Sequence, residues 1–165
     1  MGLAFDPIAE AGHNWTERGW EATDAMLAAT SITRAHQVLH ARIDAALAPL
    51  ELNFSRFEVL ALLSFTREGR LPMGKIGDRL QVHAASVTNT IQRLETLGFV
   101  DRVVHPDDGR TRLARLLPAG RAAADAGATA LATIQYGLEG LTGGQRRTVT
   151  GLLTDYRRAN ADFRD

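Results

Sequence analysis

Residues 84–120 of the chain read AASVTNTIQRLETLGFVDRVVHPDDGRTRLARLLPAG. The first part predicts a helix over 84–97, because apolar residues recur there at spacings of four and three and a glycine follows directly as a stop signal. The remainder predicts two strands, 99–104 and 111–117, around a turn rich in Pro, Asp and Gly at 105–110. A helix followed at once by a two-stranded ribbon is typical of the second half of a winged DNA-binding module.

The residues upstream supply the first half of such a module. A short helix is expected over 72–80, and a break at 81–83 separates it from the helix that follows. Before it, Asn53 or Ser55 caps another helix. Two helices joined by a tight turn and followed by a hairpin predict a winged helix-turn-helix over residues 53–117.

The segments outside this module are also expected to be helical. Residues 21–48 contain no Gly or Pro and carry apolar residues at spacings of three and four, so they predict one long amphipathic helix that ends near Pro49. Pro118 begins a further helix and Thr142 caps a last one. One side of this last helix carries the apolar residues Val149, Leu152, Leu153 and Tyr156.

These patterns predict a fold that is mainly α with a small β-hairpin wing (α+β). The winged module is already a complete fold, so the apolar stripes of the outer helices favour a dimerisation region formed by 21–50 and 118–165. Residues 1–20 contain scattered Gly and Pro and are expected to form an irregular or partly helical N-terminal arm.

The helix over 84–97 has a face of hydrogen-bonding side chains opposite its apolar face. Ser86, Asn89 and Arg93 project there at spacings of three and four, and small side chains at the start of the helix allow a close approach to base edges. We therefore predict that this helix reads the major groove of duplex DNA. The candidate contacts on this helix are Ala85, Ser86, Thr88, Asn89, Thr90 and Arg93.

The hairpin and the short helix provide further candidates. Arg110 is expected at the hairpin tip, where a guanidinium can enter a narrow minor groove, and Asp108 is expected to orient it through an ion pair. Arg112 follows on the return strand. Lys75 is placed to contact phosphate oxygens, which fixes position without reading sequence.

Composition narrows the functional classes. The net charge is zero, but residues 55–121 hold eleven Lys/Arg against seven Asp/Glu, while the flanks hold eight against twelve. The chain has no cysteine, which excludes disulfides, thiolate metal sites and thiol redox sensing.

Charged residues interrupt every apolar run of the first twenty residues, so we expect a cytoplasmic location, with neither a signal peptide nor a membrane partner. The chain shows none of the common catalytic motifs, and neither an enzyme nor a cofactor is predicted.

Three stretches of the chain resemble MarR-type bacterial transcriptional regulators. They are LNFSRFEVLALL (52–63), SVTNTIQRLETLGFVDR (86–102) and HPDDGRTRLARLLPAGR (105–121), within a resemblance that extends over about residues 30–160. The resemblance implies a homodimer with intertwined N- and C-terminal helices, two winged heads on a pseudo-palindromic operator, and a ligand pocket between heads and dimerisation region.

Carried over position by position, Ser86, Asn89 and Arg93 match the base-reading positions of the family, and Asp108 and Arg110 match its wing pair. The resemblance thus implies a sequence-specific regulator, a repressor that a small organic effector releases. The chain departs from the family at 82–85, where relatives often place a serine cap and a basic residue. A metal-responsive or architectural DNA-binding protein of the same fold is the alternative function.

Four residues outside the winged module are candidates for the effector site. Trp15 and Trp20 lie in the N-terminal arm, and His36 and His40 lie four apart on the long helix. The tryptophans are also expected to serve as packing anchors. The histidine spacing is that of a metal-binding pair, but two ligands fall short of a metal sensor's set, so no metal site is predicted.

Overall fold

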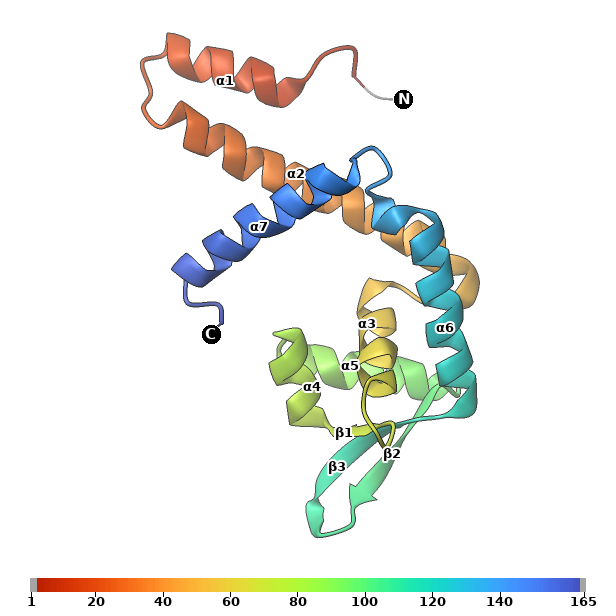
Figure 1. Ribbon diagram of the computed structural model, residues 1–165. Coiled ribbons are helices and arrows are strands. Elements are labelled where there is room, and N and C mark those ends of the chain that lie inside the picture. Colours follow the sequence, from red (N-terminus) through yellow and green to blue (C-terminus); the bar gives the residue numbers. More distant parts are fainter. Residues whose placement is uncertain (1–2, 164–165) are drawn as a thin grey trace. The chain divides into compact units, whose positions relative to one another are not determined.

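The computed structural model describes residues 3–163. Within them the chain forms two compact units, which divide between Ala41 and Arg42. Helix α2 (Thr23–Leu47) begins in the first unit and ends in the second (Figure 1). The prediction of one long helix before Pro49 is therefore confirmed.

The first unit holds one further helix, α1 (Pro7–Glu17). It begins where the carboxylate of Asp6 accepts a hydrogen bond of 2.9 Å from the N–H of Ile8. Gly12 is buried where a β-carbon would come within 2.8 Å of Leu27 on α2, so the glycine permits close packing of the two helices. The segment expected to be irregular or partly helical over 1–20 is thus a capped helix of eleven residues through its middle.

The second unit contains a three-stranded antiparallel sheet and the helices around it. In chain order its elements are α3 (Phe54–Ser64), β1 (Arg70–Pro72), α4 (Met73–Leu80), α5 (Ala84–Thr96), β2 (Val100–His105), β3 (Asp108–Leu116), α6 (Pro118–Thr133) and α7 (Gly143–Ala159). Figure 1 shows β2 and β3 as a hairpin that extends from α4 and α5. The predicted winged helix-turn-helix, mainly α with a small β wing, is confirmed.

Apolar residues of the second unit meet in a core between the helices and the sheet. Among the buried residues of this core are Phe57, Leu60, Leu63, Ile76, Val87, Ile91, Leu94, Val100, Leu113 and Ala114. Asn53 caps α3, since its side-chain oxygen accepts a hydrogen bond of 3.0 Å from the N–H of Arg56; Ser55, the alternative cap, lies within the helix. The apolar spacing that predicted the helix over 84–97 is confirmed in α5.

The sheet differs from the sequence prediction in two respects. Strand β1, which was not expected, pairs with β3 through Leu71 opposite Ala114, so β3 is the central strand. Strand β3 is also longer than predicted and begins at Asp108, so only Pro106 and Asp107 form the turn between β2 and β3. The prediction that Arg110 sits at the tip was therefore wrong, because it lies within β3.

Two close contacts fix the C-terminal half of the second unit. A β-carbon on Gly120 of α6 would lie 2.0 Å from the backbone oxygen of Phe99, so only glycine permits this approach. Helix α7 begins with the predicted cap Thr142, which forms a reciprocal capping box with Gln145.

Among residues 3–163, no helix is both long and apolar enough to span a bilayer.

Candidate nucleic-acid interface

Helix α5 separates its residues into a buried and an exposed face, as its sequence predicts. Val87, Ile91 and Leu94 are almost completely buried. The opposite face carries the exposed predicted contacts Ala85, Ser86, Thr88, Asn89 and Arg93, whereas Thr90 is half-buried. Asn89 and Arg93 line a shallow pocket of about 290 Å³ together with Gln92 and Thr96.

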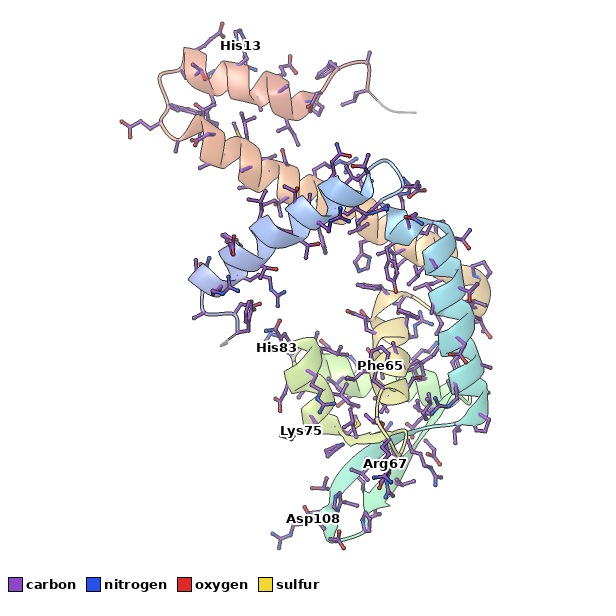
Figure 2. The ribbon with its side chains drawn as sticks, viewed as in Figure 1. His13, Phe65, Arg67, Lys75, His83 and Asp108 are labelled. Atoms are coloured by element: carbon purple, nitrogen blue, oxygen red, sulfur yellow. The ribbon has the colours of Figure 1, made fainter. Side chains whose placement is uncertain are left out.

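The start of α5 has no side-chain cap. His83 occupies the N-cap position in extended backbone conformation, but its side chain makes no capping hydrogen bond. Gln81 precedes it in the left-handed conformation, with φ at 54°, and ends α4. Figure 2 shows Lys75 and His83 on the helix-turn-helix and Asp108 at the far end of the hairpin.

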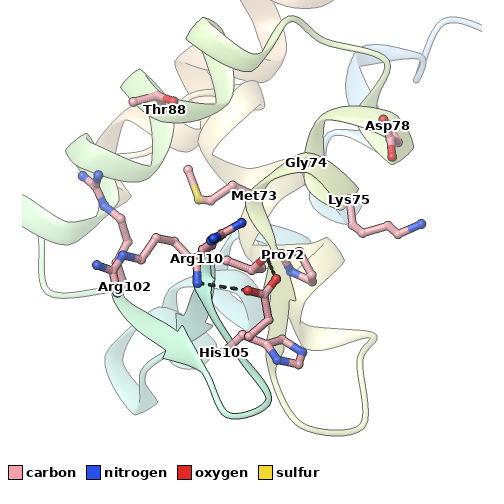
Figure 3. Close-up of a pocket in the computed structure, with 12 residues that line it drawn as sticks. Pro72, Met73, Gly74, Lys75, Asp78, Thr88, Arg102, His105 and Arg110 are labelled. Atoms are coloured by element: carbon pink, nitrogen blue, oxygen red, sulfur yellow. Dashed lines mark hydrogen bonds between the residues drawn. The ribbon is translucent and has the colours of Figure 1, made fainter.

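A hollow of about 760 Å³ lies between the helix-turn-helix and the wing (Figure 3). Its lining comes from β1, α4, α5 and both hairpin strands: Pro72, Met73, Gly74, Lys75, Asp78, Thr88, Arg102, His105, Asp108, Arg110, Thr111 and Arg112. Five residues predicted from the sequence as DNA contacts are therefore brought together on one surface. They are Lys75, Thr88, Asp108, Arg110 and Arg112.

The sequence prediction missed Arg102, His105 and Gln92. Arg102 and His105 lie on β2 and line the hollow, and Gln92 lies beside Asn89 on α5. Gln92 follows Asn89 by three residues. Because this spacing places both on one helix face, it could have identified Gln92 as a candidate contact.

Asp108 organises the hairpin end through hydrogen bonds. Its carboxylate accepts one of 2.6 Å from the hydroxyl of Thr111 and one of 3.0 Å from the backbone N–H of Arg110. These two bonds, the Thr111 bond foremost, lower the pKa of Asp108 below its ordinary value. The expected ion pair between Asp108 and the Arg110 guanidinium is therefore replaced by a contact with the Arg110 backbone.

Two arginine–carboxylate pairs brace the wing. Oε2 of Glu95 on α5 accepts a hydrogen bond of 2.7 Å from Nε of Arg102, and Nη2 of Arg102 forms an ion pair with the same oxygen at 2.5 Å. Asp101 accepts bonds from Nε and Nη2 of Arg115 at 2.9 and 2.5 Å. The hydrogen bonds from Arg115 lower the pKa of Asp101, and the same contacts raise the pKa of Arg115.

The four residues predicted for an effector site lie in the first unit. Trp15 and Trp20 pack edge to face with ring centroids 4.6 Å apart, and the Trp15 Nε1 donates to the backbone oxygen of Glu21. The rings of His36 and His40 lie 5.6 Å apart. In the part of the chain that the structure describes, no group of three or more His, Asp or Glu is arranged to hold a metal ion.

A separate cavity of about 410 Å³ lies within the second unit. Most of its lining is apolar or aromatic: Phe54, Phe57, Glu58, Ala61, Leu62, Ser64, Phe65, Leu80, Ala124, Asp125, Ala128 and Tyr136. None of the four predicted effector residues is among them.

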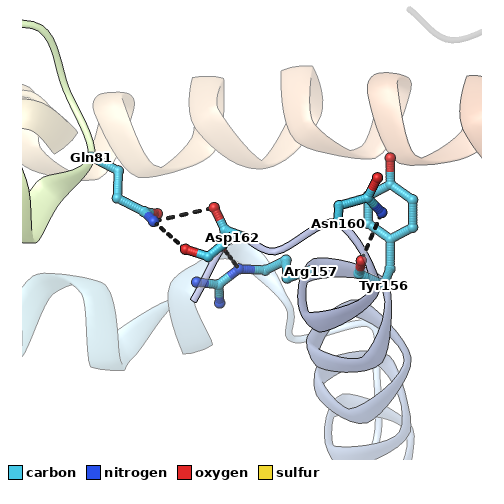
Figure 4. A network of polar contacts seen from close by, with 5 residues as sticks. All are labelled: Gln81, Tyr156, Arg157, Asn160 and Asp162. Atoms are coloured by element: carbon cyan, nitrogen blue, oxygen red, sulfur yellow. Dashed lines mark hydrogen bonds and ion pairs between the residues drawn. The ribbon is translucent and has the colours of Figure 1, made fainter. Parts of the chain in front are cut away.

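The C-terminal segment contacts the helix-turn-helix (Figure 4). The side-chain amide of Gln81 donates to the backbone oxygen and to the carboxylate of Asp162, both at 3.1 Å. Arg157 of α7 donates to the other carboxylate oxygen at 2.6 Å. The end of α7 is thereby linked to the turn that precedes α5.

Comparison with known proteins identifies the family. A model of the MarR family matches residues 50–111. Sco5413, a MarR family transcriptional regulator from Streptomyces coelicolor, has 38% identity and a TM-score of 0.81 over 87% of this chain and 100% of its own. Sco3205 from the same organism, solved in complex with DNA, has 20% identity and a TM-score of 0.73 over 88% of this chain and 92% of its own.

A curated HTH-type transcriptional regulator from Mycobacterium tuberculosis is 36% identical over 63 residues. The match spans 38% of this chain and 44% of the length of that relative. The fold and these relatives are those of transcriptional regulators rather than enzymes. With the Sco5413 match covering that protein completely, the chain belongs to the MarR family of transcriptional regulators.

Proposed function

We propose that the protein is a sequence-specific DNA-binding repressor that acts in the cytoplasm as a homodimer on a pseudo-palindromic operator. The observation that carries the proposal is the joint surface of α5 and the wing. Asn89 and Arg93 stand exposed on α5, and Lys75, Arg110 and Arg112 line the adjoining hollow. Amide and guanidinium groups suit base edges in the major groove, and cations beside them suit the phosphate backbone.

The wider family supports DNA as the partner. The S. coelicolor regulator Sco3205 shares this fold and was solved in complex with DNA. We infer that α5 of this chain enters a major groove while the hairpin carrying Arg110 reaches the flanking minor groove.

An exposed apolar row on α7 supports the homodimer. It consists of Val149, Leu152, Leu153 and Tyr156, and Leu152 and Tyr156 are 66% and 64% exposed. Such a row on a helix is costly in water and is typical of a helix that packs against another subunit. Two copies would present two α5 helices to successive major grooves, which requires an inverted repeat.

The cavity of about 410 Å³ supports release by a small organic effector. Its aromatic lining, which includes Phe54, Phe57 and Tyr136, favours a flat apolar molecule, and the adjacent acid Asp125 favours a cationic group on it. A ligand there would touch both α3 and α6, so it would act on the packing that positions the winged module. Trp15, Trp20, His36 and His40 remain the sequence-based alternative for this site.

Selection of bound sequences from a random duplex pool tests the proposal. We expect recovery of an inverted repeat with half-sites about 10 base pairs apart, bound by two chains. Equal affinity for random and selected duplexes at physiological salt would contradict it and favour an architectural role. Metal analysis of the purified protein tests the metal-responsive alternative.

A further inference from the structure

We propose that Glu95 determines the sequence specificity of this interface by holding Arg102 away from the DNA backbone. The inference rests on the proposed DNA-binding function and assigns a role to two residues outside the predicted contacts. Glu95 acts through Arg102 and is thus a positioning residue.

The pair joins the two parts of the interface. Glu95 lies in the last turn of α5, and Arg102 lies on β2 of the wing. Nε of the guanidinium donates a hydrogen bond of 2.7 Å to one carboxylate oxygen, Oε2, and Nη2 lies 2.5 Å from the same oxygen as an ion-pair contact. The side chains are 29% and 36% exposed, so the pair is partly shielded from water and less screened than a fully exposed one.

Arg102 also belongs to the lining of the hollow. Lys75, Arg110 and Arg112 line the same hollow, so a free guanidinium on Arg102 would add a fourth Lys or Arg side chain beside the DNA backbone. Phosphate contacts carry no sequence information and raise affinity for every duplex. Glu95 offsets the charge of Arg102, and the hydrogen bond and ion-pair contact between them oppose a turn of the guanidinium toward a phosphate.

The pair also restricts the wing geometrically. Because the planar guanidinium accepts few orientations, the contact fixes the distance between the end of α5 and β2. The base-reading face of α5 and the wing then dock together in one arrangement. Loss of Glu95 is expected to loosen this arrangement and, at the same time, to free the guanidinium of Arg102.

The neighbouring pair provides a matched control. Asp101 precedes Arg102 on β2 and pairs with Arg115 by two hydrogen bonds, one to each carboxylate oxygen, but neither residue lines the hollow. Successive strand residues point to opposite faces of a sheet. Asp101→Asn and Glu95→Gln therefore make the same charge change and break the same kind of pair, but only Glu95→Gln releases an arginine at the DNA interface.

The experiment measures binding of the full-length variants to the selected operator and to a scrambled duplex by fluorescence anisotropy between 50 and 200 mM salt. One added phosphate contact steepens the salt dependence by about 0.9, or about threefold across this range. Relative to Asp101→Asn, we expect Glu95→Gln to bind the scrambled duplex more tightly at low salt, to show this steeper dependence, and to lose operator preference. The double variant Glu95→Gln/Arg102→Gln should lose the added salt dependence.

Three outcomes would overturn the inference. Glu95→Gln could match Asp101→Asn on both duplexes, or it could weaken both without a steeper salt dependence, which would leave a structural role only. Arg102→Gln alone could reduce the salt dependence of the wild-type background, which would show that Arg102 already binds phosphate. A wild-type protein that binds both duplexes equally would instead contradict the proposed function, and the inference with it.

Discussion

At the scale of one residue, Gly120 is required where α6 crosses the backbone just before β2, because any larger side chain would clash there. The β-carbon of an alanine there would lie 2.0 Å from the backbone oxygen of Phe99. We expect Gly120→Ala to lower the free energy of unfolding by about 3 kcal/mol, because the helix must shift to relieve the clash. Urea denaturation measures the change. Gly144→Ala is the control, since its nearest neighbour outside the helix backbone would be Thr142 Oγ1 at 4.0 Å; equal losses would refute the steric argument.

Asn89 is the residue on which base reading depends most directly. Its side chain is exposed on α5, so its replacement should leave the fold intact. We expect Asn89→Ala to weaken operator binding by about 1–3 kcal/mol and to broaden the selected sequence at one position. Asn14→Ala, the same change at an exposed residue of α1, should leave affinity unaltered. Unchanged operator affinity in Asn89→Ala would remove this residue from the readout.

Asp101 confers a pH dependence on the wing. Arg115 holds the pKa of this carboxyl below its ordinary value, so the pair stabilises the fold above the unfolded pKa and the stabilisation is lost as pH falls through the folded pKa. We expect wild type to exceed Asp101→Asn in unfolding free energy by less than about 1 kcal/mol near neutral pH, because the pair is solvent-exposed. Urea titrations should show this difference shrinking below about pH 4. A difference that persists unchanged at lower pH would contradict the assignment.

At the scale of elements, α5 begins without a capping side chain. The backbone of His83 has the extended conformation of an N-cap, but its imidazole donates or accepts no capping bond. We expect His83→Ser to raise the free energy of unfolding by about 1 kcal/mol, because the hydroxyl can accept from an N–H of the first turn. Thermal and urea unfolding test the gain, with His83→Ala as the reference that lacks a cap. If serine and alanine are equally stable, the cap has not formed.

The elements also show what could be predicted from sequence. The helices and hairpin strands had local signals: apolar periodicity, Pro at the start of helices, and Gly98 after α5. Strand β1 had none, because three residues acquire strand geometry only by pairing with β3. Scattered residues such as Gly12 and Gly19 led to the prediction of an irregular or partly helical arm over 1–20, but Gly12 lies within α1, where it packs against Leu27.

The candidate site was predictable only in part, because local sequence does not encode contacts between elements. Exposed residues on α5 follow from helical spacing within one element. The role of Arg102 depends on Glu95 in another element and on the strand register, which local sequence does not encode. The turn of only Pro106 and Asp107 shifted Arg110 from the expected tip into β3.

At the scale of the whole molecule, the apolar row on α7 predicts how the protein assembles. We expect Leu152→Glu to convert a dimer into a monomer and to abolish high-affinity operator binding, because a charge would be buried between subunits. Sedimentation velocity measures the assembly state, and circular dichroism verifies the fold. Thr150→Glu places the same charge on α7 outside the row and should remain dimeric. A dimeric Leu152→Glu protein would place the subunit interface elsewhere.

The contact between Asp162 and Gln81 has a practical consequence for anyone who purifies or labels this protein. A histidine tag, fluorophore or reporter domain attached directly after residue 165 would be separated by three residues from Asp162, which is bonded to the turn that precedes α5. Bulk or charge added there would strain the attachment of α7 to the helix-turn-helix, and affinity measurements would then report on the fusion as much as on the regulator. Labels are better removed by proteolysis, or attached through a cysteine engineered at an exposed position of α1, since the chain has no native cysteine to compete.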